Sequence, residues 1–164
     1  MSTSKSLPAY LEKMEAEVLE MNFKEQTLKM SFNPDEFFCH SDGTILQGGF
    51  ITTMLDASMA FLVMQLVDFK KVPLSIDVNV NFLSSGGPKL TIAVARINKI
   101  GKSIAFSSAD LFQDDELIAT ASSSIKLKDF ESRNWIDDTI GKNVKIIRKN
   151  LKLQNPRKVR LYIF

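Results

Sequence analysis

The longest apolar run in the chain extends from Phe50 to Val67 and follows the pair Gly48-Gly49. Its hydrophobic side chains fall on every side of a helical projection, which predicts a helix that is buried all round. One acid, Asp56, lies in the middle of this run. An unpaired buried carboxylate is energetically expensive, so we interpret Asp56 as a functional residue in a core helix.

The same run is long enough to span a bilayer. However, an aspartate at the centre of a membrane helix costs about 2.5–3.5 kcal/mol on insertion scales. Thr52, Thr53, Ser58 and Gln65 make the run more polar still. We therefore expect the core helix of a soluble domain and no integral membrane segment.

Two elements are predicted before this helix. Apolar residues recur every three or four positions from Leu7 to Met21, with glutamates between them, and Pro8 suits a first helical turn. This spacing predicts an amphipathic helix over residues 8–20. Residues 23–32 are predicted to form a strand, followed by a connection over residues 36–42.

Apolar and polar residues alternate without interruption from Leu74 to Phe82. The alternation predicts a strand with two distinct faces. The apolar face comprises Leu74, Ile76, Val78, Val80 and Phe82, and the polar face comprises Ser75, Asp77, Asn79 and Asn81. Further strands are predicted over residues 89–99, 103–112 and 117–127, and hairpin-length turns join them into an antiparallel meander.

One buried helix and four or five long antiparallel strands predict an α+β domain. The sheet must curl around the helix, because nothing else in the chain is long enough to cover it. We divide the chain into an N-terminal amphipathic helix over residues 1–21, a domain over residues 22–128 and a tail over residues 129–164.

Composition narrows the possible chemistry. Cys39 is the only cysteine and His40 the only histidine of the 164 residues, so an internal disulfide is ruled out and a structural zinc site nearly so. A lone cysteine fits a reducing compartment, and no apolar stretch follows Lys5 as it would in a signal peptide. We expect a cytoplasmic protein without a metal or cofactor.

Charge is distributed unevenly along the chain. Eight of the 21 basic residues lie in residues 142–164, which contain no acid, so the preceding residues carry 13 basic and 19 acidic side chains. A basic tail can contact phosphates or a membrane surface, but a solvated extension is its commoner meaning. We therefore predict no nucleic-acid partner.

Gly48 and Gly49 open the predicted core helix, where the first backbone N–H groups lack internal partners. This site suits an anion or a carbonyl oxygen that develops negative charge, although a tight turn also requires small residues. Asp56 follows Gly48 by eight residues, roughly 12 Å along a helix. If the two act on one carbon, one of them must come from a second subunit, which predicts a dimer with interfacial sites.

Two further polar residues are weaker candidates. Ser75 lies on the polar face of its predicted strand, where it either orients the Asp56 carboxylate or a water, or simply faces solvent. His40 lies in a connection, where a histidine is more often a loop residue than a catalytic group.

Taken together, these residues resemble the hotdog-fold acyl-CoA thioesterases, specifically the phenylacetyl-CoA thioesterase-like branch. The resemblance covers residues 22–128 and rests on four segments: His40-Ser-Asp-Gly43, Gln47-Gly48-Gly49 with Asp56, the strand LSIDVNVNFLSS that contains Ser75, and the closing strands after Ile100-Gly101-Lys102. In this family the position of His40 is usually Asn, and that of Gln47 is usually His.

The resemblance implies an antiparallel sheet wrapped around one helix, in a homodimer or homotetramer. It implies that the Gly48 N–H polarises the thioester carbonyl, while Asp56 of the other subunit activates water or attacks directly with support from Ser75. His40 and Gln47 would belong to the catalytic group, and Gly49 and Lys102 would contact the acyl-CoA.

The leading hypothesis is therefore hydrolysis of an acyl-CoA thioester to a free acid and coenzyme A. A non-catalytic acyl-CoA-binding module on the same fold is the alternative. A hydratase or dehydratase fits less well, because such relatives use a histidine with an acid and His40 precedes the helix. The acyl group is not determined by the sequence.

Overall fold

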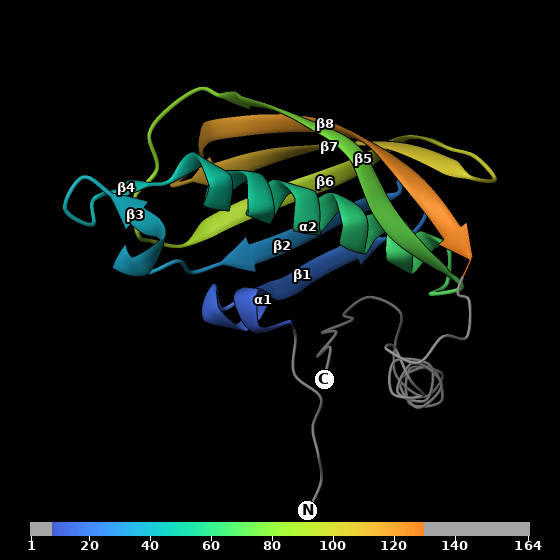
Figure 1. The fold of residues 1–164 in the computed structure, drawn as a ribbon, viewed down its shortest axis with the longest axis horizontal. Coiled ribbons are helices and arrows are strands. Elements are labelled where there is room, and N and C mark those ends of the chain that lie inside the picture. The colour runs from blue at the N-terminus through green and yellow to red at the C-terminus, as the bar shows by residue number, and fades with distance from the viewer. Residues whose placement is uncertain (1–7, 130–164) are drawn as a thin grey trace, which may run out of the picture.

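The computed structural model describes residues 8–129, so the predicted basic tail over residues 142–164 lies outside the described residues. Six strands form one antiparallel sheet in the order β1-β2-β6-β7-β8-β5, and a short β3–β4 hairpin precedes the long helix (Figure 1). The elements are α1 (Ala9–Lys13), β1 (Glu17–Asn22), β2 (Thr27–Phe32), the 3-10 turn η1 (Glu36–Phe38), β3 (Cys39–His40), β4 (Ile45–Leu46), α2 (Gly48–Leu66), β5 (Lys71–Phe82), β6 (Thr91–Ile100), β7 (Ile104–Gln113) and β8 (Glu116–Asp129).

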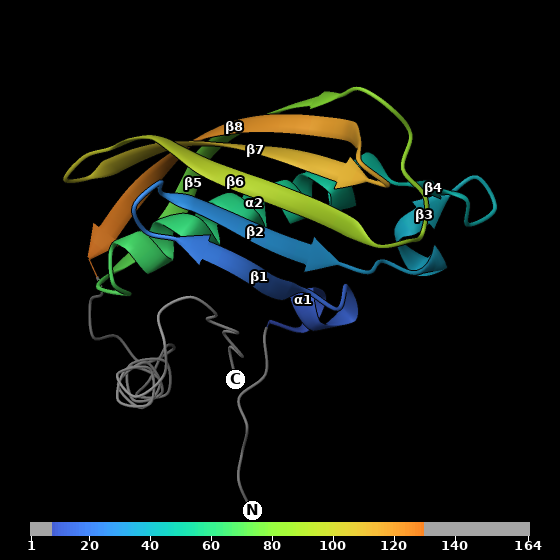
Figure 2. The same ribbon diagram turned by 180° about the vertical axis from the view of Figure 1, so that it is seen from behind.

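The sheet curves around α2, which lies along its concave side, as the front and back views show (Figures 1 and 2). The helix contacts β2, β5, β6, β7 and β8. The predicted α+β hotdog architecture is confirmed. Although α2 has the length and composition of a membrane span, half of that stretch is buried inside the protein, as expected for a core helix.

The prediction that α2 is buried all round is wrong. Met54, Leu55, Met59, Leu62 and Val63 are fully buried against the sheet. Residues on the opposite side, including Asp56, are only half-buried. A single six-stranded sheet covers one side of a helix, so a strip along α2 remains accessible within one chain.

The predicted helix over residues 8–20 is also wrong, because only α1 is helical and β1 begins after a turn over residues 14–16. Met14, Ala16 and Val18 are buried while Glu15 and Glu17 between them are exposed. This alternation has the period of a strand and overlaps the helical spacing that begins at Leu11. Pairing with β2 decides between the two patterns, and residues 17–22 become an edge of the sheet.

The uniform alternation predicted for β5 is interrupted by a bulge. Ser75 pairs with Ile125 of β8 and Asp77 pairs with the next residue, Ser124, so Ile76 has no partner. The extra residue shifts the alternation by one position, so side chains before and after the bulge that would lie on opposite faces of a regular strand lie on the same face. Ser75 therefore shares a face with Val78 toward α2, and Leu74 shares the outer face with Asp77. The prediction of a single apolar face from Leu74 to Phe82 is wrong.

Candidate active site

Asp56 of α2 is hydrogen-bonded to Ser75 of β5. The Ser75 Oγ donates to the Asp56 Oδ1 over 2.6 Å. This contact depends on the bulge at Ile76. In an unbroken strand, Ser75 and Val78 would lie on opposite faces, so with Val78 facing the helix Ser75 would point away from Asp56. The predicted partnership of these two residues is present in the fold, and the bulge is what makes it possible.

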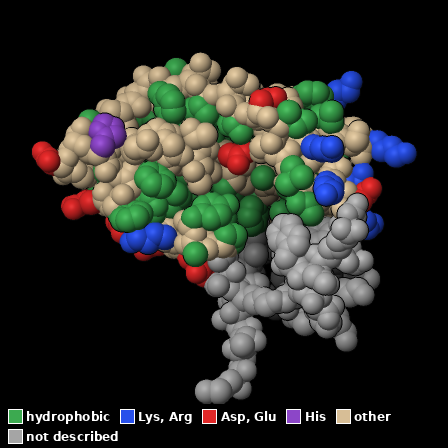
Figure 3. Space-filling model, in the orientation of Figure 1, with side chains coloured by type: hydrophobic (Ala, Val, Ile, Leu, Met, Phe, Trp, Pro, Cys, Tyr) green, Lys and Arg blue, Asp and Glu red, His purple; other side chains and the backbone are tan. Residues whose placement is uncertain are grey.

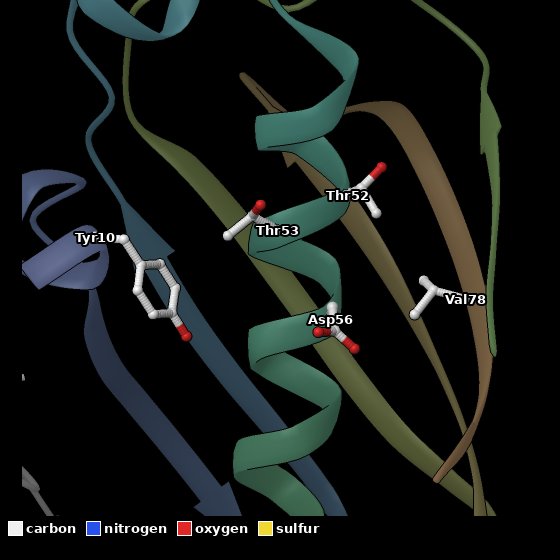
Figure 4. A pocket seen from close by; sticks show the side chains of 5 residues that line it. All are labelled: Tyr10, Thr52, Thr53, Asp56 and Val78. Carbon is white, nitrogen blue, oxygen red and sulfur yellow. The ribbon is translucent and has the colours of Figure 1, made fainter. Parts of the chain in front are cut away.

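The Asp56 carboxylate faces a pocket of about 360 Å³ on the open side of α2. Its lining comprises Tyr10, Thr52, Thr53, Asp56 and Val78, which come from α1, α2 and β5 (Figure 4). The Thr52 and Thr53 hydroxyls donate to the backbone oxygens of Gly48 and Gly49 one turn earlier. Among the side chains that line this pocket, Asp56 carries the only charge.

Tyr10 is a pocket residue that the sequence did not indicate. It belongs to α1, far from Asp56 along the chain, and no local pattern links the two. Burial raises the pKa of the Tyr10 phenol, and the negative charge of Asp56 raises it further. The phenol therefore remains a neutral hydrogen-bond donor across the physiological range.

A second group of candidate residues lies at the start of α2. The Gln47 side chain caps the helix, because its Oε1 accepts from the Gly49 N–H over 2.6 Å. The Gly48 N–H precedes this capped amide and shares the positive end of the helix dipole. A Cβ atom added to Gly48 would lie 3.1 Å from the Phe82 ring, so this ring borders the Gly48 backbone.

A loop network holds this helix start in place. The Leu46 N–H donates to the Gly86 oxygen over 2.9 Å. The buried Gln113 accepts from the Gly87 N–H and donates to the oxygens of Gly87 and Thr91. Gln113 was not among the predicted site residues, because its role depends on contacts with the loop around Gly87, which lies 26 residues earlier in the chain.

The two groups of candidate residues do not meet within one chain. Gly48 and Asp56 are separated by eight residues of a continuous helix, roughly 12 Å along its axis. The pocket beside Asp56 reaches back to Thr52 but does not include Gly48. This separation is the one that the sequence predicted from helix geometry.

The remaining predicted site residues lie at the two ends of the molecule. His40 is exposed in the β3–β4 hairpin, where its Nδ1 shares a 2.8 Å hydrogen bond with the Ser41 Oγ. Lys102 lies in the β6–β7 turn, and its backbone oxygen accepts from the Lys71 Nζ. These ends are far apart, and basic side chains gather at the β6–β7 end (Figures 1 and 3). Lys102 is therefore not brought to Asp56 or Gly48 of its own chain.

The donor set for a metal ion is absent from the part of the chain that the structure describes. No group of three or more His, Cys, Asp or Glu side chains comes together there. The chemistry that this arrangement offers is that of a carboxylate, a hydroxyl and a helix N-terminus.

Comparison with known proteins places these residues in a family context. Residues 43–120, which contain Gly48, Asp56 and Ser75, match the model of the thioesterase superfamily. No match is found among curated proteins.

Solved structures share the fold. A phenylacetic acid degradation-related protein from Ralstonia eutropha superposes with a TM-score of 0.71 at 22% identity, covering 76% of this chain and 93% of that chain. A thioesterase from Haemophilus influenzae has a TM-score of 0.67 at 14% identity, covering 76% and 86%. The PaaI protein of the Escherichia coli phenylacetic acid degradation operon has a TM-score of 0.65 at 13% identity, covering 73% and 85%. With its sheet-wrapped helix and the match over residues 43–120, the chain is similar to the thioesterase superfamily.

Proposed function

We propose that this protein is an acyl-CoA thioesterase that hydrolyses its substrate to a free acid and coenzyme A. The observation that carries the proposal is the Ser75–Asp56 hydrogen bond beside an accessible pocket. A carboxylate whose one oxygen is held by a hydroxyl donor is oriented to use its other oxygen as a base or nucleophile. The match of residues 43–120 to the thioesterase superfamily supports this reaction class.

The second half of the site is proposed to come from a second copy of the chain. β5 is an edge of the sheet, it is 12 residues long, and Leu74, Ile76 and Phe82 along it are exposed. A long apolar edge strand is a template for pairing with another strand. Antiparallel pairing of two β5 strands about their middle sets the Phe82 end of one against the Lys71 end of the other.

This pairing has a direct consequence for the candidate residues. Phe82 borders Gly48, whereas Ser75, in the first half of β5, binds Asp56. A two-fold axis through the middle of β5 therefore moves the partner's Gly48 toward Asp56. The homodimer completes the site that one chain leaves divided, and further pairing into a tetramer is compatible with it.

In this site the Gly48 N–H of one subunit binds the thioester carbonyl oxygen. Asp56 of the other subunit removes a proton from water as the water oxygen attacks the carbonyl carbon. The resulting oxyanion is stabilised by the Gly48 N–H at the positive end of α2. The intermediate then collapses, the C–S bond breaks, and the proton held by Asp56 passes to the departing thiolate. Attack by Asp56 itself, through an anhydride that water then hydrolyses, is the variant of this scheme.

The Gln47 side chain has a defined part in the scheme. Its carbonyl oxygen is occupied by the Gly49 N–H, so its amide nitrogen is left to donate beside the Gly48 N–H. His40, in the preceding hairpin, is a candidate for the coenzyme A side of the same entrance. Two neighbours have names tied to phenylacetic acid degradation, which supports arylacetyl-CoA among the first substrates to be tried.

A subunit-mixing experiment tests the composite site. Asp56→Asn and Gly48→Val should each lower thiol release from acyl-CoA, and Gly48→Val acts by pushing a side chain into the Phe82 ring. When the two inactive variants are mixed under conditions that exchange subunits, half of the sites in a mixed dimer regain both intact residues. Recovery of up to about one quarter of the wild-type activity is then expected. No recovery in demonstrated mixed dimers would contradict the composite site.

The alternative function, a non-catalytic acyl-CoA-binding module, predicts a different result. Such a module would bind acyl-CoA without releasing free thiol, and Asp56→Asn would leave the binding unchanged. Thiol release by wild-type protein that is lost in Asp56→Asn decides for the enzyme.

A further inference from the structure

Tyr10 lies at one side of the Asp56 pocket and comes from outside the α2–β5 pair. Figure 4 shows Tyr10 on one side of α2 and Val78 on the other, with Thr52, Thr53 and Asp56 on the helix between them. Tyr10 is the only aromatic residue of this lining. The width of the pocket across the open side of α2 is therefore bounded by one ring from α1 and one aliphatic side chain from β5.

The position of Tyr10 is defined because the residues that follow it, in α1 and in the turn after α1, are anchored in the fold. Leu11 and Met14 are each only 1% exposed. The Asn33 N–H donates to the Met14 oxygen over 2.7 Å, and the Lys13 Nζ binds the Asp35 Oδ2 over 2.7 Å. The α1 turn is thus joined to the connection after β2, and these contacts fix the backbone from which the Tyr10 side chain projects.

Tyr10 itself is 49% exposed, so its ring is not needed to fill the core. A tyrosine ring nevertheless presents a large rigid apolar surface, roughly 150–250 Å² for an aromatic side chain. Its phenol remains neutral, because burial and the charge of Asp56 both raise its pKa. The side chain therefore offers an uncharged wall to an acyl group rather than an ionic contact.

We infer that Tyr10 determines the size of the acyl group that the protein accepts, because its ring closes the α1 side of the Asp56 pocket. The inference rests on the proposed function, because it takes this pocket as the acyl site. Truncation of the ring opens the pocket away from β5 and admits longer or bulkier acyl groups. A larger ring at the same position restricts the pocket to smaller ones.

The experiment compares Tyr10→Ala, Tyr10→Phe and Tyr10→Trp with wild-type protein over a series of acyl-CoA substrates of increasing length. We expect Tyr10→Ala to raise the kcat/KM ratio of long to short substrates by on the order of tenfold or more, the range that one methylene group is worth in a pocket. Tyr10→Trp should shift the ratio in the opposite direction, and Tyr10→Phe should leave it unchanged. Phe23→Ala removes a similarly exposed ring in the β1–β2 turn and serves as the matched control.

Binding of non-hydrolysable S-alkyl-CoA thioethers to the same variants, measured by calorimetry, provides a second readout. An unchanged length profile in Tyr10→Ala and Tyr10→Trp, in both hydrolysis and binding, would overturn the inference. If wild-type protein hydrolyses no acyl-CoA but the thioether profile shifts with Tyr10, the hydrolase proposal fails and the role of Tyr10 stands. If no thioether binds at all, both proposals fail. Because Tyr10→Trp keeps an aromatic ring at an exposed position, the test does not depend on the folding of Tyr10→Ala.

Discussion

Replacing Ser75 by alanine tests whether the contact with Asp56 matters to the reaction. The substitution removes one hydroxyl donor at 2.6 Å from a carboxylate oxygen and leaves the backbone pairing of β5 with β8 unchanged. A hydrogen bond to a charged group contributes about 1.5–3 kcal/mol. Ser75 is exposed in the single chain, so the lower half of this range is the better expectation.

This free energy converts directly into a rate. Each 1.36 kcal/mol of lost transition-state stabilisation lowers the rate about tenfold. We therefore expect Ser75→Ala to reduce kcat by about 10-fold to 40-fold, as measured by release of free thiol from a saturating acyl-CoA. Ser122→Ala, which removes a serine hydroxyl from the outer face of the neighbouring strand β8, should retain wild-type kcat.

A double-mutant cycle with Asp56→Asn completes the test. If Ser75 acts by orienting the Asp56 carboxylate, Ser75→Ala costs little further activity once Asp56 is neutral. Two results would refute the reasoning: an equal loss in both backgrounds, or a loss of similar size in Ser122→Ala. The first would show that Ser75 acts on the substrate independently of Asp56, and the second would indicate a general effect on the sheet.

Three further predictions concern stability. In Gly49→Ala the new Cβ would lie 2.8 Å from the Gln47 Oε1, so the cap of α2 should be disrupted at a cost of about 0.5–2 kcal/mol, measured by urea unfolding. Gln113→Ala should lower the unfolding free energy by about 1–3 kcal/mol, because it leaves buried loop groups unpaired, and it should reduce activity by loosening the start of α2. Burial alone would raise the pKa of Asp110, but hydrogen bonds from Arg96 and Thr120 hold it below the usual value of 3.8, so Asp110→Asn should destabilise the fold at pH 7.

The Asp110 prediction has a defined pH dependence. A carboxyl group whose pKa is lowered by folding contributes stability above its unfolded pKa and loses that contribution as the pH falls through its folded pKa. The difference between wild-type protein and Asp110→Asn should therefore shrink below pH 3.8. Asp115→Asn, at an exposed turn position, is the matched control. A difference that is constant with pH would contradict this account.

The predictions for Gly49→Ala and Gln113→Ala can each be contradicted by one result. An unfolding free energy of Gly49→Ala equal to that of the wild type would mean that the Gln47 cap contributes nothing. For Gln113→Ala, activity that falls only as far as the folded population falls would show that the loop does not position the start of α2.

The sequence alone was sufficient to predict the central helix, the antiparallel sheet around it and the separation along the helix that keeps Gly48 and Asp56 of one chain apart. These features depend on local periodicity and on the fixed rise of a helix, which are properties of a short stretch of chain. The start of α2 at Gly48 and the strands β6, β7 and β8 lie within a few residues of their predicted positions.

Tertiary structure decided the features that require a partner element. Residues 14–18 fit both a helical and a strand pattern, but the chain turns at residues 14–16 and pairing with β2 makes a strand only from Glu17 onward. The bulge at Ile76 is visible only in the register with β8, and it turns Ser75 toward Asp56. Tyr10 reaches the same pocket because α1 folds back beside α2, a contact between segments more than forty residues apart. Pairing register and long-range packing are not encoded in local periodicity, so the pocket around Asp56 became visible only in the folded chain.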